Sequence, residues 1–194
     1  MFFGRKGYLM KKVTLLGDSI RQIGYGPIVP ALLGDEFQVW QPAENCRFAQ
    51  YTLRGMWDWA HDMEGSEIVH WNNGLWDICD IFGDGMFTPL ETYVNFMVRT
   101  AKILQKRHGK VIFATTTPVT EQNVHNSNAE IIRYNKAVVP VLADMGIIIN
   151  DLHSLMYADI DRFIRKDDNI HLTEDGAKVC AEQVARMIRE AAEG

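Results

Sequence analysis

The sequence is poor in cysteine, and its three cysteines, Cys46, Cys79 and Cys180, show no paired spacing. An odd number of cysteines without a repeated spacing does not indicate a disulfide framework. There is also no Cys-x-x-Cys pair or cysteine–histidine cluster of the kind that holds zinc. We therefore expect no metal site, and we expect all three cysteines to be small apolar residues of a core.

The sequence also lacks a basic block: 20 lysines and arginines stand against 25 acidic residues, a net charge of −5. This balance argues against a nucleic-acid partner. No apolar run reaches the length of a membrane-spanning helix. The N-terminal segment shows no apolar run of signal-peptide length followed by a small-residue cleavage site. We expect a cytoplasmic protein that neither binds nucleic acid nor enters a membrane.

Nucleotide-binding and calcium-binding motifs are missing as well. The segment Gly24-Tyr25-Gly26 lacks the third glycine and the spacing of a dinucleotide fingerprint, and there is no phosphate-binding P-loop. The aspartates of the 77–84 segment lack the glycine and terminal glutamate of a calcium loop. These absences argue against nucleotide-dependent and calcium-dependent chemistry.

What is present is an alternation of short apolar runs with longer segments of helical periodicity. The runs are Val13–Leu16, Phe37–Trp40, Glu67–Trp71, Lys110–Ala114 and Gly146–Ile149; helical spacing marks residues 51–63, 90–104, 131–145 and 177–188. Continuous runs of this kind are typical of parallel strands covered on both faces. The order predicts an α/β fold with five parallel strands between two helical layers. We expect one domain over residues 1–194, with residues 1–9 as an N-terminal extension.

The first candidate for chemistry is Gly17-Asp18-Ser19, at the end of the first predicted strand. A serine at this point has its hydroxyl at the carboxyl edge of the sheet, where nearby backbone N–H groups can face an oxyanion. Gly17 permits a tight turn, and we expect Asp18 to be structural. A hydroxyl is a weak nucleophile until a base takes its proton. The alternative is an ordinary turn.

The second candidate is Asp168-Asn169-Ile170-His171, directly before the last predicted helix. A catalytic histidine needs one ring nitrogen on the serine and an acceptor on the other, and an aspartate three residues earlier can supply that acceptor. The alternative is a surface pair beside a helix cap. His153, which also follows a predicted strand and lies near an aspartate, is the rival base.

Together these blocks resemble the GDSL or SGNH hydrolases, over the chain from Val13 to about Met187. The resemblance implies a flavodoxin-like three-layer sandwich and ester hydrolysis through a serine acyl-enzyme. It makes Ser19 the nucleophile and His171 the base, with Asp168 orienting the imidazole. No cofactor is needed for this chemistry, and the substrate is a small or carbohydrate ester.

Two blocks of the family pattern are altered. The family's oxyanion glycine is replaced, and Arg47 stands in its place, where a backbone N–H can still donate. In the third block Trp76 stands where the family has its oxyanion asparagine. We expect Asn73 to supply the missing amide, with Asn72 as the alternative. Trp76, at the exit of a strand, is a candidate platform for a sugar ring.

The family implies several substrates, and we expect a short acyl ester such as an acetylated carbohydrate. Thioesterase or lysophospholipase action on longer acyl chains is an alternative, and so is acyl transfer to another alcohol. A third is a non-catalytic module that binds glycans or acyl ligands, since two oxyanion blocks are altered. We expect Trp57 and Trp71 to be core residues rather than ligand contacts.

Overall fold

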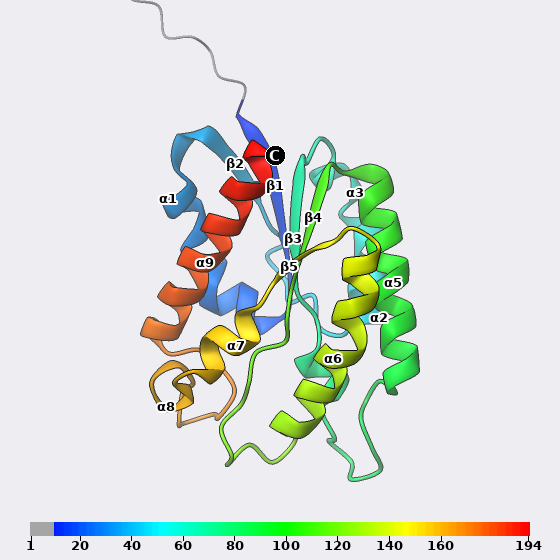
Figure 1. The fold of residues 1–194 in the computed structure, drawn as a ribbon, viewed down its shortest axis with the longest axis vertical. Helices are drawn as coiled ribbons and strands as arrows, with labels where there is room; N and C mark the ends of the chain where they lie inside the picture. Colours follow the sequence, from blue (N-terminus) through cyan, green and yellow to red (C-terminus); the bar gives the residue numbers. More distant parts are fainter. Residues whose placement is uncertain (1–9) are drawn as a thin grey trace, which may run out of the picture.

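The computed structural model describes residues 10–194, so the extension expected over residues 1–9 lies outside the described residues. Five strands form one parallel sheet in the order β2-β1-β3-β4-β5 (Figure 1). They are β1 (Lys11–Leu16), β2 (Phe37–Trp40), β3 (Ile68–Trp71), β4 (Lys110–Ala114) and β5 (Ile148–Asn150). The predicted α/β class and the five-stranded parallel sheet are confirmed.

Helices cover both faces of this sheet. They are α1 (Val29–Leu33), α2 (Ala49–Asp58), α3 (Ala60–Met63), α4 (Leu75–Ile78), α5 (Leu90–Arg107), α6 (Asn128–Asp144), α7 (Leu152–Tyr157), α8 (Ile160–Phe163) and α9 (Glu174–Glu193). In Figure 1, α1 and α9 lie on one side of the sheet, and α2, α5 and α6 lie on the other. The result is the three-layer sandwich that the alternation of strands and helices requires.

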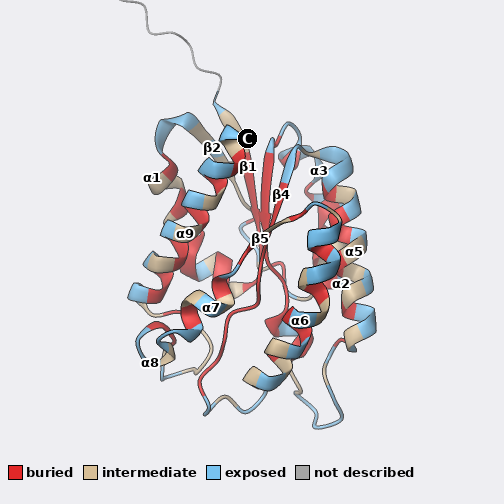
Figure 2. Ribbon diagram, in the orientation of Figure 1, coloured by how far each residue is buried: buried red, intermediate tan, exposed pale blue. Residues whose placement is uncertain are grey.

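The core lies on both faces of the sheet, as the continuous apolar runs predict. All four residues of β3 are buried, and Trp71 packs on Phe113 of β4 with ring centroids 5.0 Å apart. Figure 2 shows the buried stripes of the helices turned toward the strands. The buried residues of α9 recur at helical spacing, as in Cys180, Val184 and Ile188. This periodicity is what the sequence pattern indicates.

Two core expectations are corrected. Trp57 is 70% exposed, because α2 buries Thr52 and Met56 and the next residue along the helix is turned about 100° away. Trp59 is buried instead. Cys46 and Cys180 are buried as expected, whereas Cys79 is only partly buried. Within residues 10–194, no helix combines the length and the apolar character needed to cross a membrane.

The strand order places the functional edge. From β1 the chain moves outward to β2, then returns past β1 to β3 and continues in the opposite direction. The carboxyl ends of β1 and β3 therefore meet at a topological switch point, where open α/β sheets bind their ligands. Gly17 follows β1 at this point, and Asn72 and Asn73 follow β3.

Candidate active site

The turn after β1 presents Ser19. Gly17 leaves no room for a side chain, because a Cβ there would lie 2.0 Å from Asn72 Oδ1 and 2.7 Å from Arg21 Cβ. Ser19 then precedes a single wide helical turn, Ile20–Tyr25, as its N-cap. The first N–H groups of a helix have no partner within the helix, so the N–H of Ser19 is available to an incoming oxygen.

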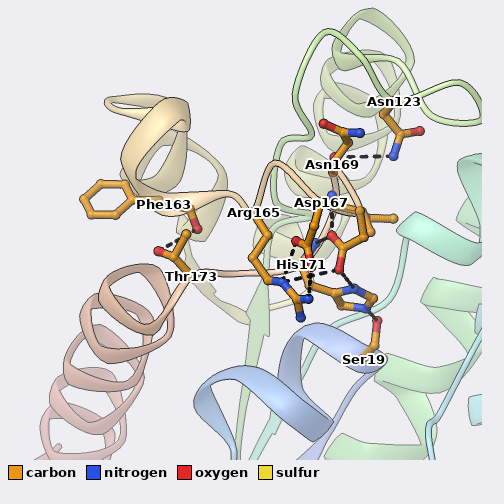
Figure 3. Close-up of polar contacts among 10 residues, drawn as sticks. Ser19, Asn123, Phe163, Arg165, Asp167, Asn169, His171 and Thr173 are labelled. Atoms are coloured by element: carbon orange, nitrogen blue, oxygen red, sulfur yellow. Dashed lines mark hydrogen bonds and ion pairs between the residues drawn. The ribbon is translucent and has the colours of Figure 1, made fainter.

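The loop before α9 brings His171 to this serine. Nε2 of His171 lies 2.8 Å from Ser19 Oγ, and Nδ1 lies 3.0 Å from Asp168 Oδ2 (Figure 3). The other carboxylate oxygen of Asp168 accepts from the N–H groups of Ile170 and His171, at 3.1 and 2.9 Å. The structure therefore joins Ser19, His171 and Asp168 in one hydrogen-bonded line, the geometry that general-base activation of a hydroxyl requires.

The surroundings of Asp168 favour the ionised form of its carboxyl group. Partial burial opposes ionisation, but the backbone N–H groups of His171 and Ile170 outweigh it and lower the pKa of Asp168 below its ordinary value. Arg165 adds its guanidinium, with Nε 3.5 Å from Asp168 Oδ2, and it also pairs with Asp167. The carboxylate is therefore kept ionised beside the imidazole.

Beneath the nucleophile lies a buried polar chain that includes one of the two candidate asparagines. Asp18 Oδ1 accepts from the N–H of Ile20 at 3.0 Å and from Asn72 Nδ2 at 2.9 Å, and Asn72 Oδ1 accepts from the hydroxyl of Tyr25 at 2.7 Å. Burial raises the pKa of Asp18, although the bonds from Asn72 and Ile20 act against this. Both ends of the Asn72 amide are thus engaged inside the protein, in support of the nucleophile turn.

Asn73, the next residue, faces the opposite way. Its Nδ2 donates to the carbonyl of Arg47 at 2.8 Å, and its Oδ1 accepts from the indole N–H of Trp71 at 2.9 Å. The hydroxyl of Tyr93 donates to the Asn73 carbonyl at 3.0 Å. An amide nitrogen carries two hydrogens, so Asn73, like Asn72, retains one donor for a further acceptor. Of the two asparagines, Asn73 is the one placed beside the Arg47 turn.

Arg47, the predicted replacement for the oxyanion glycine, has a backbone conformation that suits a glycine. Its φ is +50°, in the left-handed region that residues with a side chain rarely adopt. Its N–H donates to Asn45 Oδ1 at 2.7 Å, so the expected oxyanion donor is engaged within its own loop in this structure. The guanidinium lies over the ring of Tyr51, 4.9 Å from the centroid.

Sequence reasoning missed Arg21, a fully buried arginine two residues after the nucleophile. Its guanidinium donates to three backbone carbonyls, those of Gly17 at 3.1 Å, Pro42 at 2.8 Å and Glu44 at 2.7 Å. It therefore joins the nucleophile turn to the loop that leads to Arg47. The signal in the sequence was slight: a charged residue between Ile20 and Gln22, two positions after the Gly-Asp-Ser block.

Asp77 was also missed, and it fastens the other end of the same loop. Its two carboxylate oxygens accept from the N–H of Ala49, at 3.2 and 3.0 Å, at the first residue of α2. A negative charge at a helix N-terminus is favourable. Burial nevertheless raises the pKa of Asp77 to about 7. The loop before α2 is thus held by Arg21 on one side and by Asp77 on the other.

The raised pKa of Asp77 predicts a pH-dependent cost to stability. Between its ordinary value, 3.8, and about 7, the folded protein binds this proton more tightly than the unfolded chain does. Its contribution to the free energy of unfolding therefore falls as pH rises through this range. Asp77→Asn cannot ionise at this position. We therefore expect its free energy of unfolding to rise relative to that of wild type by on the order of a few kcal/mol between pH 4 and pH 8. Urea unfolding at both pH values measures this, and an unchanged difference would contradict it.

The rival base, His153, is held elsewhere. Asp151 accepts from the hydroxyls of Ser154 at 2.6 Å and Thr115 at 2.9 Å rather than from the imidazole. His153 stacks on Tyr157 with centroids 5.3 Å apart. The imidazole bonded to the nucleophile is that of His171.

Two further expectations concern ligands. Trp76 is 41% exposed on α4, three residues after Asn73, so its side chain is accessible to a ligand. Among residues 10–194, no group of three or more histidine, cysteine, aspartate or glutamate side chains is arranged to hold a metal ion.

No protein-family model matches the chain. It is 31% identical over 123 residues to the GDSL esterase/lipase CPRD49 of Arabidopsis thaliana and 30% identical over 123 residues to the GDSL esterase/lipase WDL1 of Oryza sativa subsp. japonica. Each match covers 56% of this chain, and 48% and 47% of those proteins. The chain thus spans about half the length of the curated relatives it matches.

Solved structures share the fold over most of the chain. An acetyl xylan esterase, AlAXEase, superposes with a TM-score of 0.79 at 20% identity, covering 91% of this chain and 99% of that one. A lipase/acylhydrolase from Enterococcus faecalis gives 0.77 at 19% identity, covering 93% and 96%. Axe2, an acetylxylan esterase from Geobacillus stearothermophilus, gives 0.74 at 15% identity, covering 92% and 94%. The resemblance indicated by the sequence blocks is confirmed.

Proposed function

We propose that this chain, a relative of the GDSL/SGNH hydrolases, is a serine ester hydrolase that acts through an acyl-enzyme. The observation that carries the proposal is the hydrogen-bonded line from Ser19 Oγ to His171 Nε2, 2.8 Å, and from His171 Nδ1 to Asp168, 3.0 Å. The same three residues were the candidates from the sequence blocks alone.

In the first half of the reaction, His171 takes the proton from Ser19 as Oγ attacks the ester carbonyl. Asp168 keeps Nδ1 protonated and stabilises the imidazolium that forms. The carbonyl oxygen becomes negative, and we assign the N–H of Ser19 and the free amide hydrogen of Asn73 as its donors. The N–H of Arg47 joins them when the bond to Asn45 opens.

In the second half, the tetrahedral intermediate collapses and the ester C–O bond breaks. His171 gives its proton to the departing alcohol, leaving the acyl group on Ser19. A water molecule then gives a proton to His171 and attacks the acyl carbonyl. The carboxylic acid leaves and Ser19 regains its proton, so no cofactor is consumed.

For the substrate, we propose a short acyl ester, most simply an acetyl group on a carbohydrate. The support is the likeness in fold to two acetyl xylan esterases and the exposed side chain of Trp76, three residues after Asn73. Longer acyl esters are the second candidate. A lipase/acylhydrolase shares the fold, and the loop after α4 exposes Ile81, Phe82 and Phe87.

A non-catalytic binding module is the third candidate, suggested by the altered oxyanion blocks. The alignment of Ser19, His171 and Asp168 weighs against it, because a module that only binds has no need for a hydroxyl bonded to an imidazole. Acyl transfer to a second alcohol shares the acyl-enzyme and differs only in what accepts the acyl group.

Covalent labelling with a fluorophosphonate tests the proposal. We expect one adduct, mapped to Ser19 by peptide mass, because only a serine activated by a base reacts readily. A folded protein that takes no adduct supports the binding module instead. For labelled protein, a chain-length series of p-nitrophenyl esters separates the substrates: a maximum at acetate supports the first candidate, and a maximum at eight or more carbons the second.

A further inference from the structure

Two residues with side chains have a positive φ in the described part of the chain, and both border the candidate site. They are Arg47, at +50°, and Asn169, at +63°. A left-handed backbone costs a residue with a side chain about 1 kcal/mol, and it persists where the surroundings hold it. Asn169 lies between Asp168 and His171, so its conformation directs the chain from the carboxylate to the imidazole.

The segment around Thr120 holds Asn169 in this conformation. The N–H of Thr120 donates to the Asn169 carbonyl at 3.2 Å, and the Thr120 hydroxyl donates to Asn169 Oδ1 at 2.7 Å. Nδ2 of Asn123 donates to the same carbonyl at 3.4 Å, as Figure 3 shows. Within residues 10–194, these are the hydrogen bonds that join residues 167–170 to another segment of the chain.

The rest of the base loop is internally braced. Asp168 bonds to the N–H groups of Ile170 and His171, which makes the carboxylate and the imidazole one unit with their loop. The two ends of this loop, residues 165–171, are joined by a hydrogen bond from the Arg165 N–H to the His171 carbonyl and by the β-bridge between Ile164 and Leu172. The position of this unit relative to Ser19 therefore depends on where the tip of the loop is fixed.

Residues 120–126 also bond to the segment that follows Asn73, the proposed oxyanion donor. Nδ2 of Asn126 donates to the carbonyl of Leu75 at 2.9 Å, and the carbonyl of His125 accepts from the N–H of Asp80 at 2.8 Å. Leu75 begins α4, two residues after Asn73. Residues 120–126 thus connect the base loop with the oxyanion side.

We infer that Asn169 is a positioning residue, which acts through Thr120 to hold His171 at bonding distance from Ser19. The inference rests on the proposed function, and it adds a residue outside the Ser19, His171 and Asp168 line. A loop tip released from Thr120 moves the imidazole, and a displacement of about 1 Å at a reacting group costs up to 100-fold in rate.

Three variants separate the contributions. Asn169→Gly keeps the left-handed backbone and removes the side-chain bond, and we expect kcat on p-nitrophenyl acetate to fall about 3–10-fold. Asn169→Ala also disfavours the backbone conformation, and we expect a fall of about 10–100-fold. Thr120→Val removes the hydroxyl but keeps the N–H, so it should resemble Asn169→Gly. The Asn169→Gly/Thr120→Val double variant should be no slower than the slower single variant, because each substitution removes the same hydrogen bond, the one between the Thr120 hydroxyl and Asn169 Oδ1.

A structural role alone would lower the thermal midpoint without this pattern in kcat. We therefore expect kcat and the rate of fluorophosphonate labelling to fall together while KM stays within about twofold. Glu121→Ala, an exposed change in the same loop, is the matched control and should leave both rates unchanged. Wild-type rates in Asn169→Ala, or additive losses in the double variant, would overturn the inference. Failure of wild type to label at all would instead overturn the proposed function.

Discussion

Ser19→Ala and His171→Ala are each expected to lower kcat for ester hydrolysis by about 10⁶-fold. The two side chains act on one proton, since Nε2 of His171 lies 2.8 Å from Ser19 Oγ. Without the base the hydroxyl is a weak nucleophile, and without the hydroxyl the base has no nucleophile to activate. The double variant should therefore be no slower than either single variant.

Steady-state hydrolysis of p-nitrophenyl acetate by the three variants measures this non-additivity. Ser154→Ala is the matched control for the serine, because Ser154 bonds to Asp151 and lies outside the proposed site. We expect it to keep wild-type activity. If His171→Ala retained a tenth of the activity while His153→Ala lost it, the assignment of the base would be wrong.

Asn73→Ala is expected to lower kcat by about 100- to 1,000-fold, the effect of removing one oxyanion donor. Its amide retains a hydrogen beyond the one donated to Arg47, and that hydrogen is the donor we assign to the oxyanion. KM should change little, because the charge on the oxygen develops only in the transition state.

Asn72→Ala is the neighbouring comparison and should act differently. Its amide supports Asp18 and Tyr25, so its removal leaves two buried polar groups unpaired and costs about 1–3 kcal/mol of stability for each. Asn73→Ala has a similar cost in stability, because it leaves the Arg47 carbonyl and the Trp71 indole N–H unpaired, but only Asn73→Ala removes the assigned oxyanion donor. Rates measured on the folded fraction, with urea unfolding of both variants, separate the effects. A larger loss of kcat in Asn72→Ala than in Asn73→Ala would reverse the assignment.

The sequence was sufficient for the features that depend on local pattern. Apolar runs predicted the strands because the inner strands β1, β3 and β4 are covered on both faces, and the helices follow their apolar spacing. Ser19, Asp168 and His171 were found because each sits in a short block at the end of an element. The structure brings these blocks together, 152 positions apart in the chain from Ser19 to His171.

Features that depend on contacts between distant segments left little trace in the sequence. Arg21 bonds to backbone carbonyls, which every residue has, so no partner residue marks it. Asp77 caps a helix that begins 28 residues earlier in the chain. Asn72 and Asn73 differ only in the side of the chain from which each projects, and successive residues after a strand alternate. The sequence alone therefore does not show which of the two asparagines faces the Arg47 turn.

The bonds of buried Arg21 couple two parts of the site. Its guanidinium binds the turn that carries the nucleophile and the loop that carries Arg47, so we expect the opening of either one to weaken the hold on the other. Opening either one removes some of the acceptors of a buried cation, a penalty that an exposed arginine would not incur. We therefore expect few native molecules to have a partly assembled site with a displaced loop. We expect the loss of catalytic turnover on heating or in denaturant to follow global unfolding of the protein rather than to precede it.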